Sequence, residues 1–169
     1  MGGKLKKFII TILALGFITP ALFAQNISQD ELVIAAVLDD FHDAAANADV
    51  ERYLGHMTDD AVFVGTDEHE RWPMQPDFIE YVNDRFAVGG WSYYSTDKKI
   101  NFSQDGSVAW FNETSISNSM GAHFRGSGVL ERINGEWKIS HYVLSVLVYN
   151  ELWEDVMGLI TEEREKREE

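Results

Sequence analysis

The chain of 169 residues contains no cysteine, which excludes disulfides and thiol chemistry. A folded domain must then depend on its hydrophobic core for stability. Basic residues are also scarce, because 14 Lys and Arg stand against 28 Asp and Glu. A surface with this excess of negative charge repels nucleic acid and anionic lipid. We therefore expect neither nucleic acid nor a membrane surface as a partner.

Several motifs that carry chemistry in other proteins are missing as well. The chain has no Gly-rich phosphate loop, no His-Glu-x-x-His and no pair of metal ligands at a characteristic spacing. It has no nucleophile elbow either. We therefore predict no metal and no cofactor, and any chemistry would depend on polar residues brought together in a pocket.

The first 24 residues have the pattern of a cleaved secretory signal. Three lysines precede an apolar run over residues 8–17, and Ala24 stands before Gln25. The alternative is a membrane anchor, but the run is short for a span and Pro20 interrupts it. We predict a secreted or periplasmic protein that leaves the membrane after cleavage. Its expected parts are a signal peptide at 1–24, a domain at 25–150, and a helix with a charged tail at 151–169.

The first half of the expected domain has the spacing of helices. Apolar residues recur every three or four positions from Ser28 to Ala48, and Ser28 with Glu31 could form a capping box. Asp49 can cap a second, short helix, and Gly89-Gly90 would end a third. Helices are therefore expected at 28–48, at 50–57 and from 76 to the glycine pair, with a strand at 61–66.

The second half, residues 91–148, has the alternation of an antiparallel sheet. Asp105-Gly106 and Asn134-Gly135 predict hairpin turns. A two-residue turn at Asn134-Gly135 would place Glu131 opposite Lys138, Leu130 opposite Ile139 and Gly128 opposite His141. Strict alternation then predicts two sets along the last strand: an inner set of Trp137, Ile139, His141, Val143 and Ser145, and an outer set of Ser140, Tyr142, Leu144 and Val146.

The predicted outer set becomes apolar toward the end of the strand, so that face needs a cover. A second copy of the chain is one candidate, which predicts a homodimer through the outer face of the sheet. The competing cover is the helix expected after Asn150, which carries Leu152, Trp153, Val156, Leu159 and Ile160.

The order of these elements and several short motifs resemble the SnoaL-like branch of the nuclear transport factor 2-like superfamily. The resemblance covers roughly residues 28–150, and the motifs are Phe63-Val64-Gly65-Thr66-Asp67 with Arg71-Trp72, Gly90-Trp91-Ser92-Tyr93, Ala109-Trp110-Phe111, Arg125-Gly126-Ser127-Gly128-Val129-Leu130 and Trp137-Lys138-Ile139. It implies an α+β cone in which N-terminal helices pack on a curved antiparallel sheet and a C-terminal helix closes the fold. Such a cone wraps a ligand pocket.

The same resemblance argues against one established chemistry. Ketosteroid isomerase, a member of the superfamily, uses a carboxylate base on the first strand and a tyrosine in the first helix. In this chain Gly65 stands at the position of the base and Phe41 at the position of the tyrosine. Neither can replace the catalytic group, so isomerase activity of that kind is not expected.

Four residues are candidates for acid/base chemistry. Asp67 lies in the polar segment 66–72, which is equally consistent with a solvated loop. His42 could point into the cone or bind Asp39 or Asp43 at the surface. His141 is predicted on the inner face, and His123 alternates with Arg125 on the neighbouring strand. Each histidine could instead be a structural residue.

The predicted ligand site combines aromatic walls with a polar anchor. We expect a cavity bounded by Trp72, Trp110, Trp137 and His141, with Arg125 or His123 at its rim. A buried Arg125 needs a partner, for which Asp67, Glu113 or a ligand anion are candidates.

Three functions are compatible with this sequence. The first is a pocket that binds a small apolar or aromatic molecule without catalysis. The second is an isomerase, cyclase or dehydratase that uses a pocket histidine and a carboxylate. The third is a protein-interaction scaffold with a filled cone. The sequence alone does not decide whether the protein is an enzyme.

Overall fold

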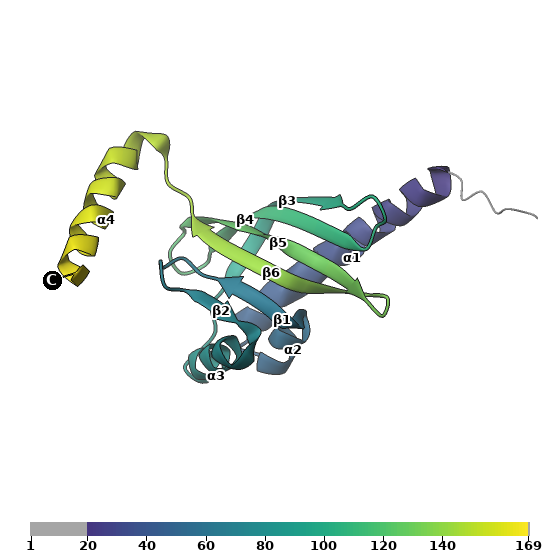
Figure 1. The fold of residues 1–169 in the computed structure, drawn as a ribbon, viewed down its shortest axis with the longest axis horizontal. Helices are drawn as coiled ribbons and strands as arrows, with labels where there is room; N and C mark the ends of the chain where they lie inside the picture. The colour runs from purple at the N-terminus through teal and green to yellow at the C-terminus, as the bar shows by residue number, and fades with distance from the viewer. Residues whose placement is uncertain (1–19, 169) are drawn as a thin grey trace, which may run out of the picture.

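A computed structural model describes residues 20–168 (Figure 1). Most of the predicted signal peptide, residues 1–19, lies outside the described residues, and side-chain surroundings are described from Gln29 onward. No helix within the described part of the chain is long and apolar enough to cross a membrane.

Helices and a single curved sheet make up the molecule. The helices are α1 (Pro20–Ala46), α2 (Val50–Gly55), the π-helical turn η1 (Met74–Phe78), α3 (Ile79–Ala87), the 3-10 turn η2 (Asn150–Leu152) and α4 (Trp153–Glu168). The strands are β1 (Met57–Val64), β2 (Arg71–Pro73), β3 (Tyr93–Phe102), β4 (Val108–Ser117), β5 (His123–Ile133) and β6 (Glu136–Val146).

The three predicted N-terminal helices are all present. Helix α1 begins at Pro20 rather than Ser28, so Ser28 lies inside the helix and does not cap it. Asp49 caps α2 as predicted, because its carboxylate accepts a hydrogen bond from the backbone N–H of Arg52. Helix α3 ends before Gly89, whose φ of +109° suits glycine.

The sheet has the strand order β2-β1-β6-β5-β4-β3. Strands β3 to β6 pair antiparallel as predicted, whereas β1 runs parallel to β6. Helix α1 packs against one face of the sheet (Figure 1). We call this the inner face and the opposite one the outer face.

The hydrophobic core lies between the helices and the inner face. Ile34, Leu38 and Phe41 of α1 are buried there. Their spacing of four and three residues places them on one side of the helix. On β4 the buried residues alternate from Ala109 through Phe111 to Ser117, so one side of the strand faces the helices.

The hairpin at Asn134-Gly135 confirms the predicted register next to the turn, and the pairing departs from the prediction at Ser140. Glu131 lies opposite Lys138 and Leu130 opposite Ile139. A β-bulge follows, because Val129 pairs with His141 and leaves Ser140 without a partner. Gly128 therefore faces Tyr142 and not His141.

The bulge reverses the faces of the remaining part of β6. Tyr142 is buried on the inner face, together with Leu144, while His141, Val143 and Ser145 point outward. The predicted inner position of His141 is therefore wrong. One extra residue in a strand moves every later side chain to the opposite face, and strict alternation cannot anticipate it.

Helix α4 forms where predicted but does not close the cone. It projects from the end of β6 as an arm (Figure 1), and none of its residues is buried.

Replacement of Gly128 by Ala should destabilise the fold, because a Cβ at this position would collide with the carbonyl oxygen of His141 beside the bulge. We expect a loss of about 2 kcal/mol in the free energy of unfolding, in the range of overpacking in a core. Chemical denaturation measures it. Gly158→Ala in α4 is the control, since its new methyl group meets no atom. Equal effects of the two substitutions would contradict the bulge geometry.

Candidate functional site

An open pocket of about 210 Å³ lies at the wide end of the cone, next to the loop that follows β1. Five aromatic side chains and Leu144 form its apolar walls, and polar groups come from Gly65, Thr66, Glu70 and Arg85. The aromatic residues are Phe63, Trp72, Tyr81, Trp91 and Tyr93.

Three segments bring the aromatic walls together. Phe63 and Trp72 are cross-strand partners in β1 and β2, so their rings lie on the same face. Tyr81 projects from α3 and stacks on Trp72, with ring centroids 4.3 Å apart. Tyr81 also lies 6.1 Å from Trp91, which precedes β3. The rings thus form a continuous row.

A close approach at Gly65 fixes the carboxylate of Glu70. A Cβ on Gly65 would collide with this carboxylate, so a larger residue here would have to displace the Glu70 side chain. The carboxylate accepts a hydrogen bond of 3.0 Å from the N–H of Asp67, and the N–H of Gly65 donates to the carbonyl of Glu70. Asp67 therefore shapes the loop, and its own carboxylate accepts from the N–H of His69.

Opposite charges and phenol groups share this end of the cone. Burial raises the pKa of Tyr81 and Tyr93, and the negative charge of Glu70 adds to the effect. Arg85 opposes it from the same pocket. The guanidinium of Arg85 is held by the carbonyl oxygens of Gly89 and Gly90.

The hydroxyl of Tyr53 lies beneath these groups. Tyr53 is fully buried, and its hydroxyl has no hydrogen-bond partner within the described part of the chain. Burial raises its pKa well above the usual value, and the phenols of Tyr81 and Tyr93 raise it further. An unpaired buried hydroxyl is unusual.

A second polar group lies deeper in the cone, around Glu113 of β4. The carboxylate of Glu113 is fully buried and lies 2.7 Å from Nε2 of His42. Ser95 donates a hydrogen bond of 2.5 Å to it, and Tyr142 donates one of 2.9 Å. Gly126, on the adjacent strand, makes room, because a Cβ there would meet both Tyr142 and Glu113.

These donors keep Glu113 charged inside the core. Burial alone would raise the pKa of Glu113, but the hydrogen bond and the charge of His42, with the hydroxyls of Ser95 and Tyr142, outweigh it. The resulting pKa lies below the ordinary value. Burial and the carboxylate together raise the pKa of Tyr142 well above its usual range, so Tyr142 remains a donor.

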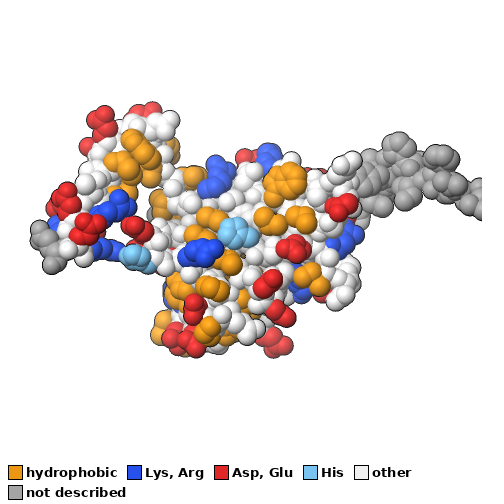
Figure 2. All heavy atoms as spheres, viewed as in Figure 1, with side chains coloured by type: hydrophobic (Ala, Val, Ile, Leu, Met, Phe, Trp, Pro, Cys, Tyr) orange, Lys and Arg blue, Asp and Glu red, His pale blue; other side chains and the backbone are white. Residues whose placement is uncertain are grey.

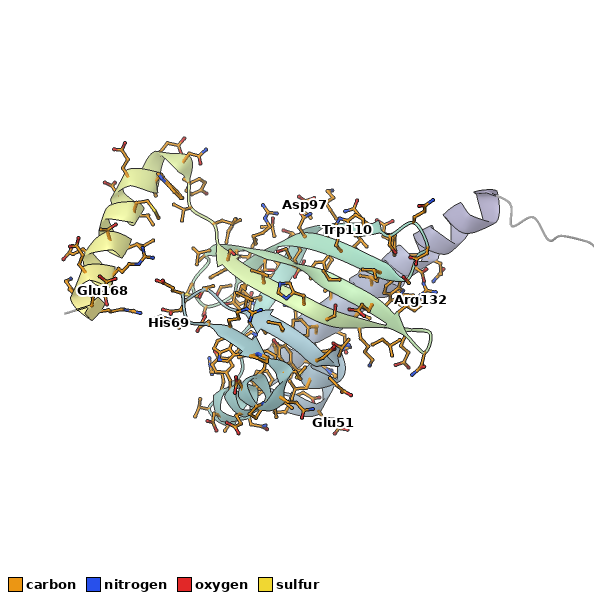
Figure 3. The ribbon with its side chains drawn as sticks, viewed as in Figure 1. Glu51, His69, Asp97, Trp110, Arg132 and Glu168 are labelled. Atoms are coloured by element: carbon orange, nitrogen blue, oxygen red, sulfur yellow. The ribbon has the colours of Figure 1, made fainter. Side chains whose placement is uncertain are left out.

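The structure brings only part of the predicted ligand site together. Trp72 lines the pocket as predicted. Trp137 is buried at the other end of β6, where Arg132 lies over its ring and Asp30 accepts from its Nε1. Figure 3 shows Arg132 at the end of the sheet away from His69, which follows β1. Trp137 is therefore no part of this pocket.

The other predicted ligand residues lie on the outer face. Trp110 is 47% exposed, and His123 and Arg125 share this face as predicted for the pair, but away from the cone. Arg125 donates a long hydrogen bond of 3.4 Å to Thr114. Glu113 is not its partner, because successive residues of β4 point to opposite faces. Together with His141, these residues cannot line the predicted cavity.

His42 is the predicted acid/base candidate that points into the cone. Its location on α1 between Phe41 and Asp43 left the direction open, and its partner proves to be Glu113 rather than Asp39 or Asp43. Glu113 and Tyr142 were not expected in this role. One signal was available, since Glu113 lies in the alternating inner set of β4 and is an acid among apolar and small residues.

Among residues 20–168, no group of three or more histidine and acidic side chains could hold a metal ion. The chain belongs to the SnoaL-like domain family, whose model matches residues 34–149. No curated protein matches it.

Solved structures with the same fold share little sequence with the chain. A nuclear transport factor 2-like protein of unknown function from Pseudomonas putida has a TM-score of 0.63 and 14% identity, over 73% of this chain and 91% of that one. A protein of unknown function from Mycobacterium tuberculosis has a TM-score of 0.64 and 18% identity, over 81% of each chain. A protein described as a candidate scytalone dehydratase from Novosphingobium aromaticivorans has a TM-score of 0.63 and 10% identity, over 74% and 89%.

Replacement of Glu113 by Gln should destabilise the protein at neutral pH by about 3 kcal/mol, because it removes the charge from a buried pair. Since the pKa of Glu113 is lowered by folding, its stabilising effect is present above the ordinary pKa of 4.5 and is lost as the pH falls below it. Denaturation curves of both chains should therefore converge in acid. Glu136→Gln, at an exposed ion pair with Lys138, should cost less than about 1 kcal/mol. A pH-independent difference would contradict the charged state of Glu113.

Proposed function

We propose that this protein is an exported small-molecule-binding protein whose ligand occupies the aromatic pocket at the wide end of the cone. The observation that carries the proposal is the row of stacked rings of Trp72, Tyr81 and Trp91 beside an open space. Flat aromatic walls with a few polar groups are typical of sites for small apolar ligands. Export remains a proposal from the signal-like N-terminus.

The polar groups of the pocket indicate that the ligand has a polar group in addition to its apolar rings. Glu70 can accept a hydrogen bond, and the phenols of Tyr81 and Tyr93 can donate. A volume of about 210 Å³ suits one or two fused rings rather than a steroid-sized molecule. We infer a flat, mostly apolar ligand with one hydroxyl or carbonyl group.

An acid/base enzyme is the second candidate, and His42 with Glu113 favours it. A histidine held by a charged carboxylate is a common general base. Structures with this fold include one described as a candidate dehydratase from Streptomyces avermitilis, with 14% identity. The binding function is better supported, because His42 and Glu113 are buried and do not line the pocket.

Tyr81→Phe should weaken binding of a ligand's polar group and leave binding of its ring unchanged. We expect 2-naphthol to bind several-fold more weakly to the variant, because its hydroxyl loses a partner in the pocket wall, whereas naphthalene should bind equally well. Titration calorimetry measures both. Tyr53→Phe is the control, because Tyr53 is fully buried, lies outside the pocket lining and has a hydroxyl without a partner within the described residues.

The aromatic wall is tested in the same assay by Trp91→Ala and Trp110→Ala. Trp91→Ala should weaken the binding of both probes at least tenfold, or about 1.4 kcal/mol. Trp110→Ala should leave binding unchanged, because Trp110 lies on the outer face. Equal effects of the two substitutions, or no binding of either probe to the unaltered chain, would reject the pocket. Deuterium uptake from heavy water into a co-purified molecule, lost in Glu113→Gln, would favour the enzyme.

A further inference from the structure

The arm formed by η2 and α4 exposes an unusual amount of apolar surface. Leu152, Trp153 and Leu159 are 48%, 57% and 68% exposed, and Ile160 is 43% exposed. With Val156 and Met157 they recur at three- and four-residue spacing along the first half of the arm. Apolar residues gathered in this way on an exposed helix indicate a surface that binds another protein surface.

Within residues 20–168, two surface ion pairs link the arm to its own domain. Arg164 binds Glu68 at 3.1 Å, and Arg167 lies 3.8 Å from Asp67. Exposed ion pairs of this kind contribute little to the stability of the attached position. A wide hollow separates the arm from the loop that follows β1, and Leu159 and Ile160 line it. The apolar side of the arm therefore lacks a cover from its own domain.

The outer face of the sheet is the second uncovered surface. Trp110, Val129 and His141 lie in one cross-strand row at its centre. The neighbouring outward residues are mostly polar, namely Asn112, Thr114, Ile116, His123, Arg125, Ser127, Glu131, Val143 and Ser145. Of these residues Glu131 alone is acidic, and it lies opposite Lys138, whereas acids outnumber bases two to one in the whole chain.

The two surfaces have complementary charges. The apolar half of the arm, residues 150–160, contains Glu151, Glu154 and Asp155 and no Lys or Arg. The outer face carries Arg125 with histidines 123 and 141, while Glu131 lies opposite Lys138. Figure 2 looks onto this face and shows a histidine with blue, orange and some red side chains over the sheet, and red and blue side chains along the arm. Apolar contact supported by opposite charge gives an interface both affinity and register.

We propose that the arm of one chain docks on the outer sheet face of a second copy, and that the second arm docks in return. The domain's own arm leaves along the direction of β6 (Figure 1) and would have to reverse within Leu147–Tyr149 to reach its own sheet. Leu147 is fixed there by a hydrogen bond from its N–H to the carbonyl of His123. A reciprocal exchange between two copies is the closed, two-fold arrangement that such a surface pair allows.

Two single substitutions test the proposal in the purified protein. Light scattering should give a dimer for the unaltered chain, and monomers for both Trp153→Asp in the arm and Trp110→Asp on the face. Val88→Asp is the matched control, because Val88 is 82% exposed at the end of α3 and belongs to neither surface. It should remain a dimer.

Mixing the two variants distinguishes this interface from a direct contact between two sheets. The Trp110→Asp chain keeps an intact arm, and the Trp153→Asp chain keeps an intact face, so a mixture should form a heterodimer through one good contact. We expect it to associate at least tenfold more tightly than either variant alone. A dimer of Trp153→Asp alone, or a monomeric unaltered chain at micromolar concentration, would overturn the proposal, and neither result bears on the ligand pocket.

Discussion

The buried carboxylate of Glu113 joins helix α1 to three strands, and the interior of the cone depends on it. It accepts hydrogen bonds from Ser95 of β3 and Tyr142 of β6 and pairs with His42 of α1. A charge in this position would be costly without all of these donors. Because each donor comes from a different element, the network allows one arrangement of helix and sheet and disfavours others that would leave the charge unpaired.

The bulge at Ser140 is the second constraint, and the network requires it. Without the extra residue, the alternation that places Ile139 inside would also place His141 inside and turn Tyr142 outward. With it, Tyr142 reaches Glu113 and stacks on Phe63 at 5.3 Å, and Leu144 reaches the pocket wall. The same shift moves His141 to the outer face. A single local irregularity therefore decides which residues belong to the cone and which to the exposed surface.

Local signals in the sequence were sufficient for the fold but only partly for the site. Asn134-Gly135 predicts the hairpin and its first pairs, and Asp49 and Gly89 predict helix boundaries, because each acts locally, through a positive φ at Asn134, Gly135 and Gly89 and through a side-chain cap at Asp49. Trp72 was placed in the pocket because it follows the first strand closely. Strict alternation predicts His141 on the wrong face, because the spacing of residues does not indicate the extra residue at Ser140. Trp110 and Arg125 lie in regularly alternating strands, and residue type alone did not show which face of β4 and β5 is turned toward the helices.

The sheet separates two surfaces that differ in both shape and charge. Its inner face curves around rings and phenols that can select a small apolar molecule. Its outer face carries Arg125 and few acids over the central strands, whereas the first half of the arm is acidic and apolar. The loop that follows β1 connects the two, since Glu70 faces the pocket while Asp67 and Glu68 contact the arm.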